Sequence, residues 1–146
     1  MSVTKPTKIR LDSLVEVETA TANQEKTIKQ WEDGNHVSLL GSAGTGKSFL
    51  GISMGLETVL DKNTEQEKMI IVRSTVATRN QGFLPGDESE KEAPFAEAYS
   101  GIANELVKGG DGWNRLRAQG ILDFTSTSYK RGVTFHDAVV FVDEIQ

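Results

Sequence analysis

Residues 41–48 read GSAGTGKS and match the glycine-rich pattern G-x-x-x-x-G-K-[S/T] at every position that the pattern fixes. Glycines let the backbone curl so that successive N–H groups point at a bound phosphate chain. Lys47 would then place a positive charge on the β- and γ-phosphates, and the Ser48 hydroxyl could bind Mg²⁺. The pattern predicts a nucleotide-binding loop, against the alternative of an ordinary glycine-rich turn. The predicted nucleotide contacts are Gly41, Ser42, Ala43, Gly44, Thr45, Gly46, Lys47, Ser48 and Phe49.

The residues on both sides of this loop favour the nucleotide interpretation. Residues 36–40 form a short apolar run, which is typical of a buried parallel strand that enters the loop. Residues 49–60 carry apolar side chains at near-helical spacing, which predicts a helix directly after it. The N-terminal amides of such a helix would face the phosphates. Gly51 and Gly55 share one face of this helix, and we expect them to allow a close approach to a sheet.

A second apolar run, at residues 138–142, is followed directly by two acids, Asp143 and Glu144. In open α/β sheets, ligands gather at the carboxyl ends of the strands, so both acids should face the phosphate loop. Asp143 would hold Mg²⁺, usually through water, and Glu144 would orient and deprotonate an attacking water. The alternative is a pair of solvated acids at a strand end. Taken with the upstream loop, the pair predicts a metal ligand and a general base.

Composition and charge narrow the class of protein. The 146 residues fit one domain, and no apolar stretch approaches the length of a membrane-spanning helix. The N-terminus lacks the apolar core of a secretory signal, and the chain has no cysteine. We therefore expect a cytoplasmic protein without a membrane partner. The net charge of −5 argues against a broad nucleic-acid-coating surface, and the best local basic pair is Lys130–Arg131.

The order of predicted elements indicates the fold class. Residues 1–18 form an N-terminal arm or an edge strand, and residues 19–146 form the domain proper. Predicted helices and strands then alternate, which favours a three-layer α/β fold with a mostly parallel sheet. Residues 80–94 are a long irregular stretch, either functional or a solvated acidic surface. The other predicted helices span 21–33, 94–108 and 111–119, and the other strands span 69–72 and 121–124.

Gln24 allows two interpretations. Thr21-x-x-Gln24 fits a helix capping box, which is a structural role. A glutamine on a helix just before the predicted phosphate-loop strand could also bind the Watson–Crick edge of adenine, because its amide both donates and accepts hydrogen bonds. Spacing alone leaves the two interpretations open.

Together these residues resemble the PhoH-like family of ATPases, over roughly residues 23–146. Besides the 41–48 loop, the resemblance rests on the segment 82–87, GFLPGD, which is specific to the family. Ser74 in place of a usual proline, Lys130 and Val133 depart from the family pattern, as in a phage-borne member acting in a host cytoplasm. Further matches are Arg73 with Val76, Glu90-Lys91, Pro94, Tyr129-x-Arg131-Gly132-x-Thr134 and Asp143-Glu144-x-Gln146.

The resemblance implies a RecA-like P-loop NTPase sheet related to superfamily-one helicases, with ATP and Mg²⁺ as ligands. It also implies RNA or single-stranded DNA as a partner and favours the adenine role of Gln24. The contacts that it implies with nucleic acid or with a coupled activity are Arg73, Lys130, Arg131 and Gln146.

The chain ends at Gln146, directly after the predicted Mg²⁺-binding acids. In the architecture that the resemblance implies, a later strand inserts between the strand before the phosphate loop and the strand before Asp143. We therefore expect a sheet that lacks its C-terminal strands, in a fragment of a longer protein or in a chain where something else fills the gap. Open strand edges at such a gap would favour a homo-oligomer.

Three functional hypotheses follow from these patterns. The first is a Mg²⁺-dependent ATPase of the PhoH-like type. The second is a nucleoside or small-molecule kinase, which shares the phosphate loop but needs no water-activating acid. The third is a non-catalytic nucleotide-binding fragment. Glu144 beside Asp143 favours hydrolysis over the kinase.

Overall fold

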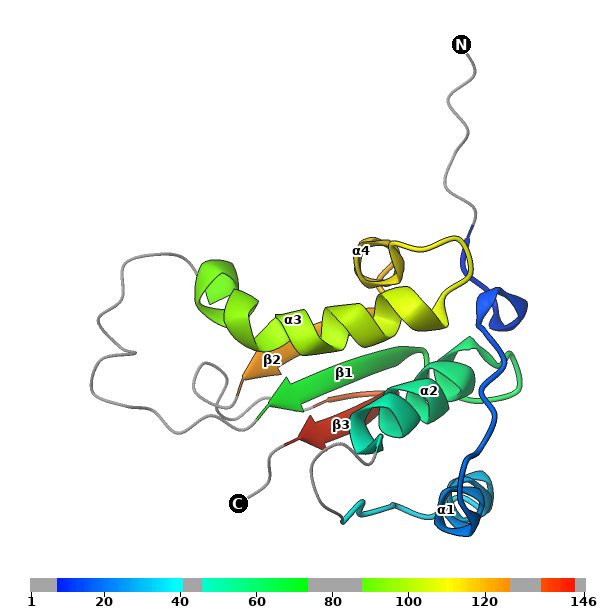
Figure 1. Cartoon of the computed structure of the whole chain (residues 1–146). Coiled ribbons are helices and arrows are strands. Elements are labelled where there is room, and N and C mark those ends of the chain that lie inside the picture. The colour runs from blue at the N-terminus through cyan, green and yellow to red at the C-terminus, as the bar shows by residue number, and fades with distance from the viewer. Residues whose placement is uncertain (1–7, 41–45, 74–87, 127–134, 144–146) are drawn as a thin grey trace.

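The computed structural model describes residues 8–40, 46–73, 88–126 and 135–143, with the backbone alone for residues 88–95. Helices and strands are mixed along the chain, with β1 between α2 and α3, and the longest helices lie along the sheet (Figure 1). The α/β class with a parallel sheet is therefore confirmed. The elements are the short 3₁₀ helix η1 (Leu11–Ser13), the helices α1 (Ala22–Glu32), α2 (Lys47–Leu60), α3 (Glu88–Leu106) and α4 (Gly112–Ala118), and the strands β1 (Lys68–Arg73), β2 (Leu122–Ser126) and β3 (Ala138–Asp143).

The three strands form one parallel sheet in the order β2-β1-β3. Ile71 of β1 is in register with Phe124 of β2 and with Phe141 of β3, so these three side chains share one face. Two positions further along, Ser126, Arg73 and Asp143 form a row where the strands end. The register thus places Arg73 and Asp143 side by side at the carboxyl edge of the sheet.

Helices α2, α3 and α4 cover the same face of this sheet (Figure 1). A Cβ added at Gly51 of α2 would collide with the ring of Phe141. The ring of Tyr99, on α3, lies 5.6 Å from that of Phe124, and the ring of Trp113, on α4, lies 6.1 Å from it. Since Phe124 and Phe141 point to one face, all three helices pack on that face, and the hydrophobic core lies between them and the sheet.

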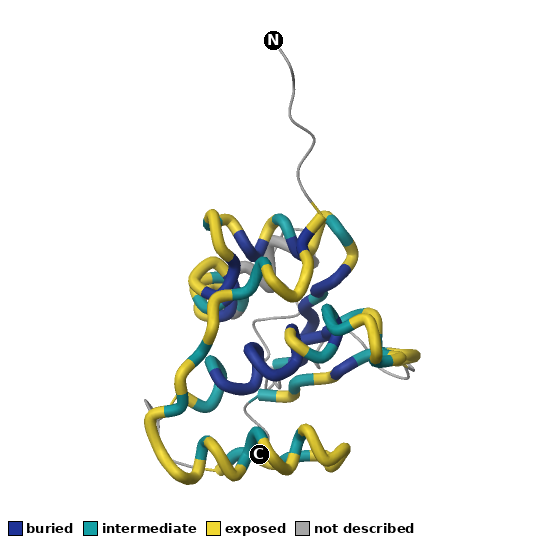
Figure 2. Tube along the Cα trace, turned by 90° about the vertical axis from the view of Figure 1, so that its right-hand side faces the viewer, coloured by how far each residue is buried: buried dark blue, intermediate teal, exposed yellow. Residues whose placement is uncertain are grey.

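The predicted close approach of α2 to the sheet is confirmed at both of its glycines. The hypothetical Cβ at Gly51 meets Phe141, and one at Gly55 would lie 2.7 Å from the sulfur of Met69. Residues 50–56 of α2 are all buried, whereas α1 has no buried residue and packs on the outside of α2 (Figure 2). Trp31 joins the two helices, because its indole N–H donates to the Thr58 hydroxyl at 2.8 Å.

Two sequence-based expectations about elements were wrong. Residues 36–40 form no strand, and Leu40 is 92% exposed. An extended segment needs a neighbour with which to exchange backbone hydrogen bonds, and β1, β2 and β3 pair only with one another among the described residues. Helix α3 also begins at Glu88, so part of the stretch expected to be irregular is helical. The helix continues through Pro94, although proline inside a helix removes one backbone hydrogen bond and crowds the carbonyl of the preceding turn.

A groove of about 570 Å³ lies between residues 37–40 and β3. Within the described residues β3 is an edge strand, paired with β1 alone, and its Val140 and Val142 are 38% and 42% exposed. Its lining includes the charged residues Lys47 and Asp143 and the apolar residues Trp31 and Met54. The groove occupies the place where the expected later strand would run.

No helix in the described part of the chain is long and apolar enough to cross a membrane.

Residues 8–17 run along the C-terminal end of α3. The Val15 N–H donates to the Leu106 carbonyl at 2.7 Å, and the Lys108 N–H donates to the Ser13 carbonyl at 2.9 Å. Ile9 is 1% exposed and belongs to the core. This segment is thus tied to the domain by backbone hydrogen bonds and by a buried side chain.

Candidate nucleotide-binding site

Helix α2 begins immediately after the glycine-rich loop. Its N-cap residue, Gly46, has a φ of 80°, a left-handed conformation that glycine adopts without steric cost. The first two residues of the helix are Lys47 and Ser48, so their side chains and the first-turn amides lie at its positive end. Residues 41–45 lie outside the described residues. The start of α2 therefore has the backbone arrangement that an anion site at a helix N-terminus requires.

The last residue of β3 meets the start of α2. The Ser48 hydroxyl donates a hydrogen bond of 3.4 Å to the Oδ2 oxygen of Asp143. The two residues are 95 positions apart in the chain, and they meet because α2 packs along β3 through Gly51 and Phe141. A hydroxyl and a carboxylate thus converge at the carboxyl edge of the sheet. Oxygen ligands of this kind are those that Mg²⁺ prefers, with its remaining positions filled by phosphate oxygens and water.

Tyr99, on α3, is the residue of this site that sequence reasoning missed. Its hydroxyl donates to Asp143 Oδ2 at 2.6 Å and accepts from Arg73 Nη1 at 3.4 Å. Burial, and secondly the hydrogen bond to Asp143, raise the pKa of the Tyr99 phenol, which therefore stays protonated and can donate. In the sequence, Tyr99 falls on the apolar stripe of the helix predicted at 94–108, with Ile102 and Leu106, a position that indicates a core residue. The available signal was its hydroxyl, because a buried tyrosine usually hydrogen-bonds that group.

The family model of the PhoH-like proteins matches residues 16–146 of this chain. The chain belongs to the PhoH-like family. It is 40% identical over 116 residues to protein PhoH2 of Mycolicibacterium smegmatis, covering 75% of this chain and 25% of the relative. It is 33% identical over 127 residues to the PhoH-like protein of Bacillus subtilis, covering 86% of this chain and 39% of that relative. The matched part of the chain thus spans between a quarter and two fifths of these relatives.

In this PhoH-like chain, Gln24 lies beside the start of α2. The Thr21 hydroxyl accepts a hydrogen bond of 3.2 Å from the Gln24 N–H, which is the cap contact that the sequence predicted. The Gln24 side-chain oxygen accepts from the Ala20 N–H at 2.7 Å. Its amide nitrogen lies 3.8 Å from where a Cβ of Gly46 would stand. Thr21 therefore caps α1 through the Gln24 N–H, and the Gln24 side chain binds the residue before the cap while it also lies near Gly46; contact with adenine stays a prediction.

Some of the remaining predicted site residues of the PhoH-like chain lie in the described part of the structure, and the others lie outside it. Phe49 is half-buried and packs against the core, while Lys47 lines the groove beside Asp143. The described residues contain no group of three or more histidines, cysteines, aspartates or glutamates placed to hold a metal ion. The two predicted Mg²⁺ ligands, Ser48 and Asp143, are hydrogen-bonded to each other. The predicted site residues that lie outside the described part are Gly41, Ser42, Ala43, Gly44, Thr45, Lys130, Arg131, Glu144 and Gln146.

Proposed function

We propose that this PhoH-like chain binds Mg·ATP where α2 meets β3 and carries part of an ATPase site. The observation that carries the proposal is the hydrogen bond from Ser48 to Asp143. It joins a hydroxyl directly behind a glycine-rich loop to a carboxylate at the end of a parallel strand. Those two groups belong to the two sequence segments that, taken together, predicted a nucleotide site.

Each side chain has a defined task in this proposal. Lys47 and the first amides of α2 hold the phosphates, because they are the positive groups at the end of the loop. Ser48 and Asp143 hold Mg²⁺. The chemistry that a bound Mg²⁺ supplies is neutralisation of charge on the β- and γ-phosphate oxygens. Glu144, the next residue after Asp143, accepts the proton of the attacking water.

Gln24 is assigned to the adenine base. Gln24 lies beside Gly46, and its side-chain oxygen accepts a hydrogen bond from the Ala20 N–H. This bond holds the amide nitrogen of Gln24 close to the loop. An amide nitrogen donates to an acceptor such as a ring nitrogen of adenine. The residue would then select the base while the loop holds the phosphates.

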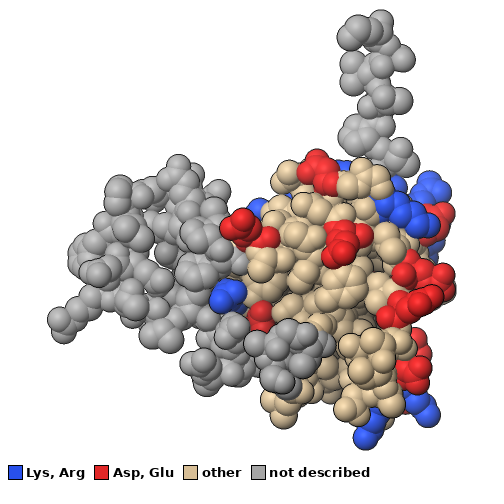
Figure 3. Space-filling view, in the orientation of Figure 1, with Lys and Arg blue, Asp and Glu red and all other residues tan. Residues whose placement is uncertain are grey.

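The proposal includes coupling of hydrolysis to RNA or single-stranded DNA, with the nucleic acid bound at a local contact and not over a broad surface. On the face in Figure 3, basic and acidic side chains of the described residues are interspersed, which fits the net charge of −5. Such a surface does not attract nucleic acid broadly. We assign the contact to Arg73 and to Lys130, Arg131 and Gln146, and we place the protein in the cytoplasm.

Two other functions remain distinguishable by experiment. A kinase would transfer the γ-phosphate to an acceptor, and a non-catalytic fragment would bind nucleotide without turnover. Release of inorganic phosphate from Mg·ATP, measured under single-turnover conditions with and without single-stranded RNA or DNA, separates hydrolysis from both alternatives. Hydrolysis predicts phosphate release that needs no acceptor; the kinase predicts release only as a trace beside a phosphorylated acceptor.

The direct test is calorimetric titration of Mg·ATP into the wild type and the Lys47→Ala variant. A hydrogen bond to a charged group contributes about 1.5–3 kcal/mol, so the variant should bind roughly 10- to 100-fold more weakly. Lys62→Ala removes an exposed lysine just beyond the other end of α2 and should leave affinity unchanged. Equal affinity of wild type and Lys47→Ala would contradict the proposed site.

A further inference from the structure

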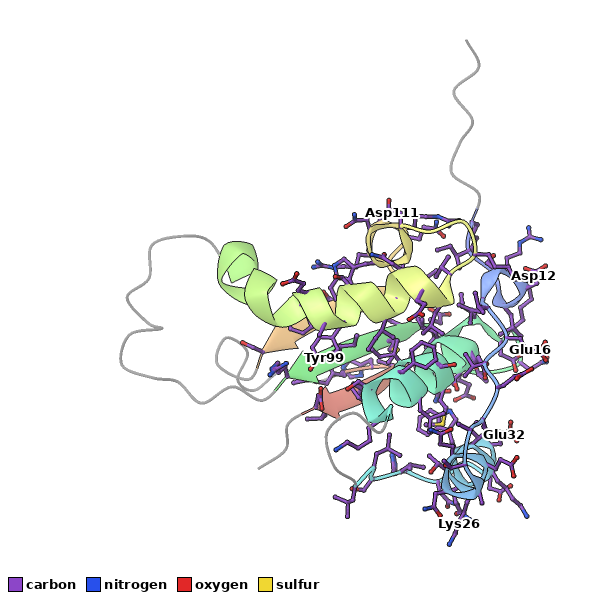
Figure 4. All side chains as sticks on the ribbon, viewed as in Figure 1. Asp12, Glu16, Lys26, Glu32, Tyr99 and Asp111 are labelled. Carbon is purple, nitrogen blue, oxygen red and sulfur yellow. The ribbon has the colours of Figure 1, made fainter. Side chains whose placement is uncertain are left out.

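The Tyr99 hydroxyl stands between two charged residues at the carboxyl edge of the sheet. It lies 2.6 Å from Asp143 Oδ2 and 3.4 Å from Arg73 Nη1. Figure 4 shows Tyr99 near the ends of the strands, on the side that α3 covers. Arg73 and Asp143 are partners in the register of β1 and β3, so the hydroxyl from α3 joins the ends of two adjacent strands.

The direction of these two hydrogen bonds is determined by the donors. An arginine side chain can only donate, so the tyrosine oxygen accepts from Arg73. A phenol has one proton, and that proton is then directed at Asp143. Hydrogen bonds in such a chain polarise one another, which strengthens the contact with the carboxylate. Tyr99 thus restrains the orientation of the Asp143 carboxylate.

Core packing alone does not require this hydroxyl. The Tyr99 residue is 1% exposed and its ring packs on Phe124, a role that phenylalanine would fill equally well. A hydroxyl in such a place is costly unless it is hydrogen-bonded. Its partner is the same carboxylate oxygen that the Ser48 hydroxyl contacts.

We propose that Tyr99 is a positioning residue for the metal site, holding the Asp143 carboxylate in the orientation in which it binds Mg²⁺ together with Ser48. This inference rests on the proposed function, because it assigns Tyr99 as the hydrogen-bonding partner of the proposed metal ligand Asp143. Groups that orient metal ligands typically contribute 10- to 100-fold to metal affinity. Removal of the Tyr99 hydroxyl should therefore weaken metal binding by roughly 10-fold or more and leave metal-free nucleotide binding intact.

The test is Tyr99→Phe with Mn²⁺ as the metal probe and a non-hydrolysable ATP analogue as the nucleotide. Free Mn²⁺ is counted by electron paramagnetic resonance during titration of the protein–nucleotide complex. Affinity for the analogue in EDTA is measured in parallel by calorimetry. Thr58→Val is the matched control, since it removes another hydroxyl that is hydrogen-bonded inside the domain, between α1 and α2. Circular dichroism and thermal melting report whether each variant folds.

The outcomes separate this inference from the proposed function. Weaker Mn²⁺ binding by Tyr99→Phe, with unchanged affinity in EDTA and an unaffected Thr58→Val control, supports the positioning role. Equal Mn²⁺ affinity in wild type and Tyr99→Phe overturns it while the nucleotide site stands. If the wild type binds neither the analogue nor Mn²⁺, the proposed function itself fails.

A second measurement keeps the inference testable if Tyr99→Phe does not fold. The chain has two tyrosines, so Tyr129→Phe leaves Tyr99 as the only one. Protein labelled with 3-fluorotyrosine then gives one fluorine resonance, from the group beside Asp143. We expect the chemical shift of that resonance to change when Mg²⁺ is added to the complex with the analogue. Mg²⁺ bound to Asp143 would alter the charge next to the Tyr99 ring. An unmoved resonance at saturating Mg²⁺ would overturn the inference.

Discussion

The hydroxyl of Ser48 lies 3.4 Å from the Oδ2 oxygen of Asp143, although 95 positions separate the two residues in the chain. The contact between the two residues is tertiary, since no single helix, strand or turn contains both. Ser48 is held at the start of α2 by the left-handed turn at Gly46, and Asp143 is held at the end of β3 by its pairing with β1. The contact therefore depends on how closely α2 lies along the sheet.

We expect Gly51→Ala to destabilise the domain, because its new methyl group would collide with the ring of Phe141. Overpacking of this kind typically costs about 1–3 kcal/mol in the free energy of unfolding. Gly101→Ala, at an exposed helical position with open space around it, is the control and should stabilise the domain by up to about 1 kcal/mol. Urea unfolding followed by circular dichroism measures both.

Gly51→Ala combined with Phe141→Leu should regain part of the lost stability, since leucine can give way where the aromatic ring cannot. An equal loss of stability in the single and the double variant would show that Phe141 does not set the separation of α2 and β3.

We expect Glu144→Gln to keep nucleotide affinity and to lose hydrolysis in a protein that includes the rest of the ATPase fold. A positioned general base contributes about 10²–10⁴ in rate, whereas the amide keeps the size of the side chain. Single-turnover phosphate release measures the rate, and Glu105→Gln, at an exposed position on α3, is the control. Equal turnover by wild type and Glu144→Gln would contradict the role of general base and would show that Glu144 is a solvated acid.

We expect the 146-residue chain to self-associate through the outer edge of β3. Open strand edges with apolar side chains favour pairing with another chain, and Val140 is 38% exposed there. Val140→Lys should lower the mean mass in light scattering, since lysine on an edge strand opposes such pairing. Val15→Lys changes a valine of similar exposure (39%) away from the sheet and should not alter it. A wild type that stays monomeric at high concentration would contradict the edge argument.

The parts of the fold that local sequence determines were predicted correctly. The loop at 41–48 and the apolar run before Asp143 indicated a helix at 49–60 and a strand at 138–142, and the structure has α2 at Lys47–Leu60 and β3 at Ala138–Asp143. Gly51 and Gly55 indicated the close packing that brings these two elements together. Each of these features depends on one segment and one neighbour, so short patterns were sufficient.

Two features could not be predicted from local patterns. The run at residues 36–40 has the composition of a strand, but a strand also needs a hydrogen-bonding neighbour, and sequence does not state which neighbour is present. Tyr99 was assigned to a buried stripe, correctly, since it is 1% exposed. Its hydrogen bond to Asp143 depends on where α3 crosses the sheet, which is a tertiary relationship.

The central claim, that Ser48 and Asp143 form one metal site for a bound nucleotide, is tested most directly by a double-mutant cycle. Affinity for a non-hydrolysable ATP analogue is measured by calorimetry with Mg²⁺ and with EDTA, for wild type, Ser48→Ala, Asp143→Asn and the double variant. Groups that act on one ligand couple, so the double variant should lose little more than Asp143→Asn alone. We predict that the gain in affinity from Mg²⁺ falls in both single variants while affinity in EDTA stays equal to that of the wild type. A gain from Mg²⁺ that is the same in all four proteins would contradict the account.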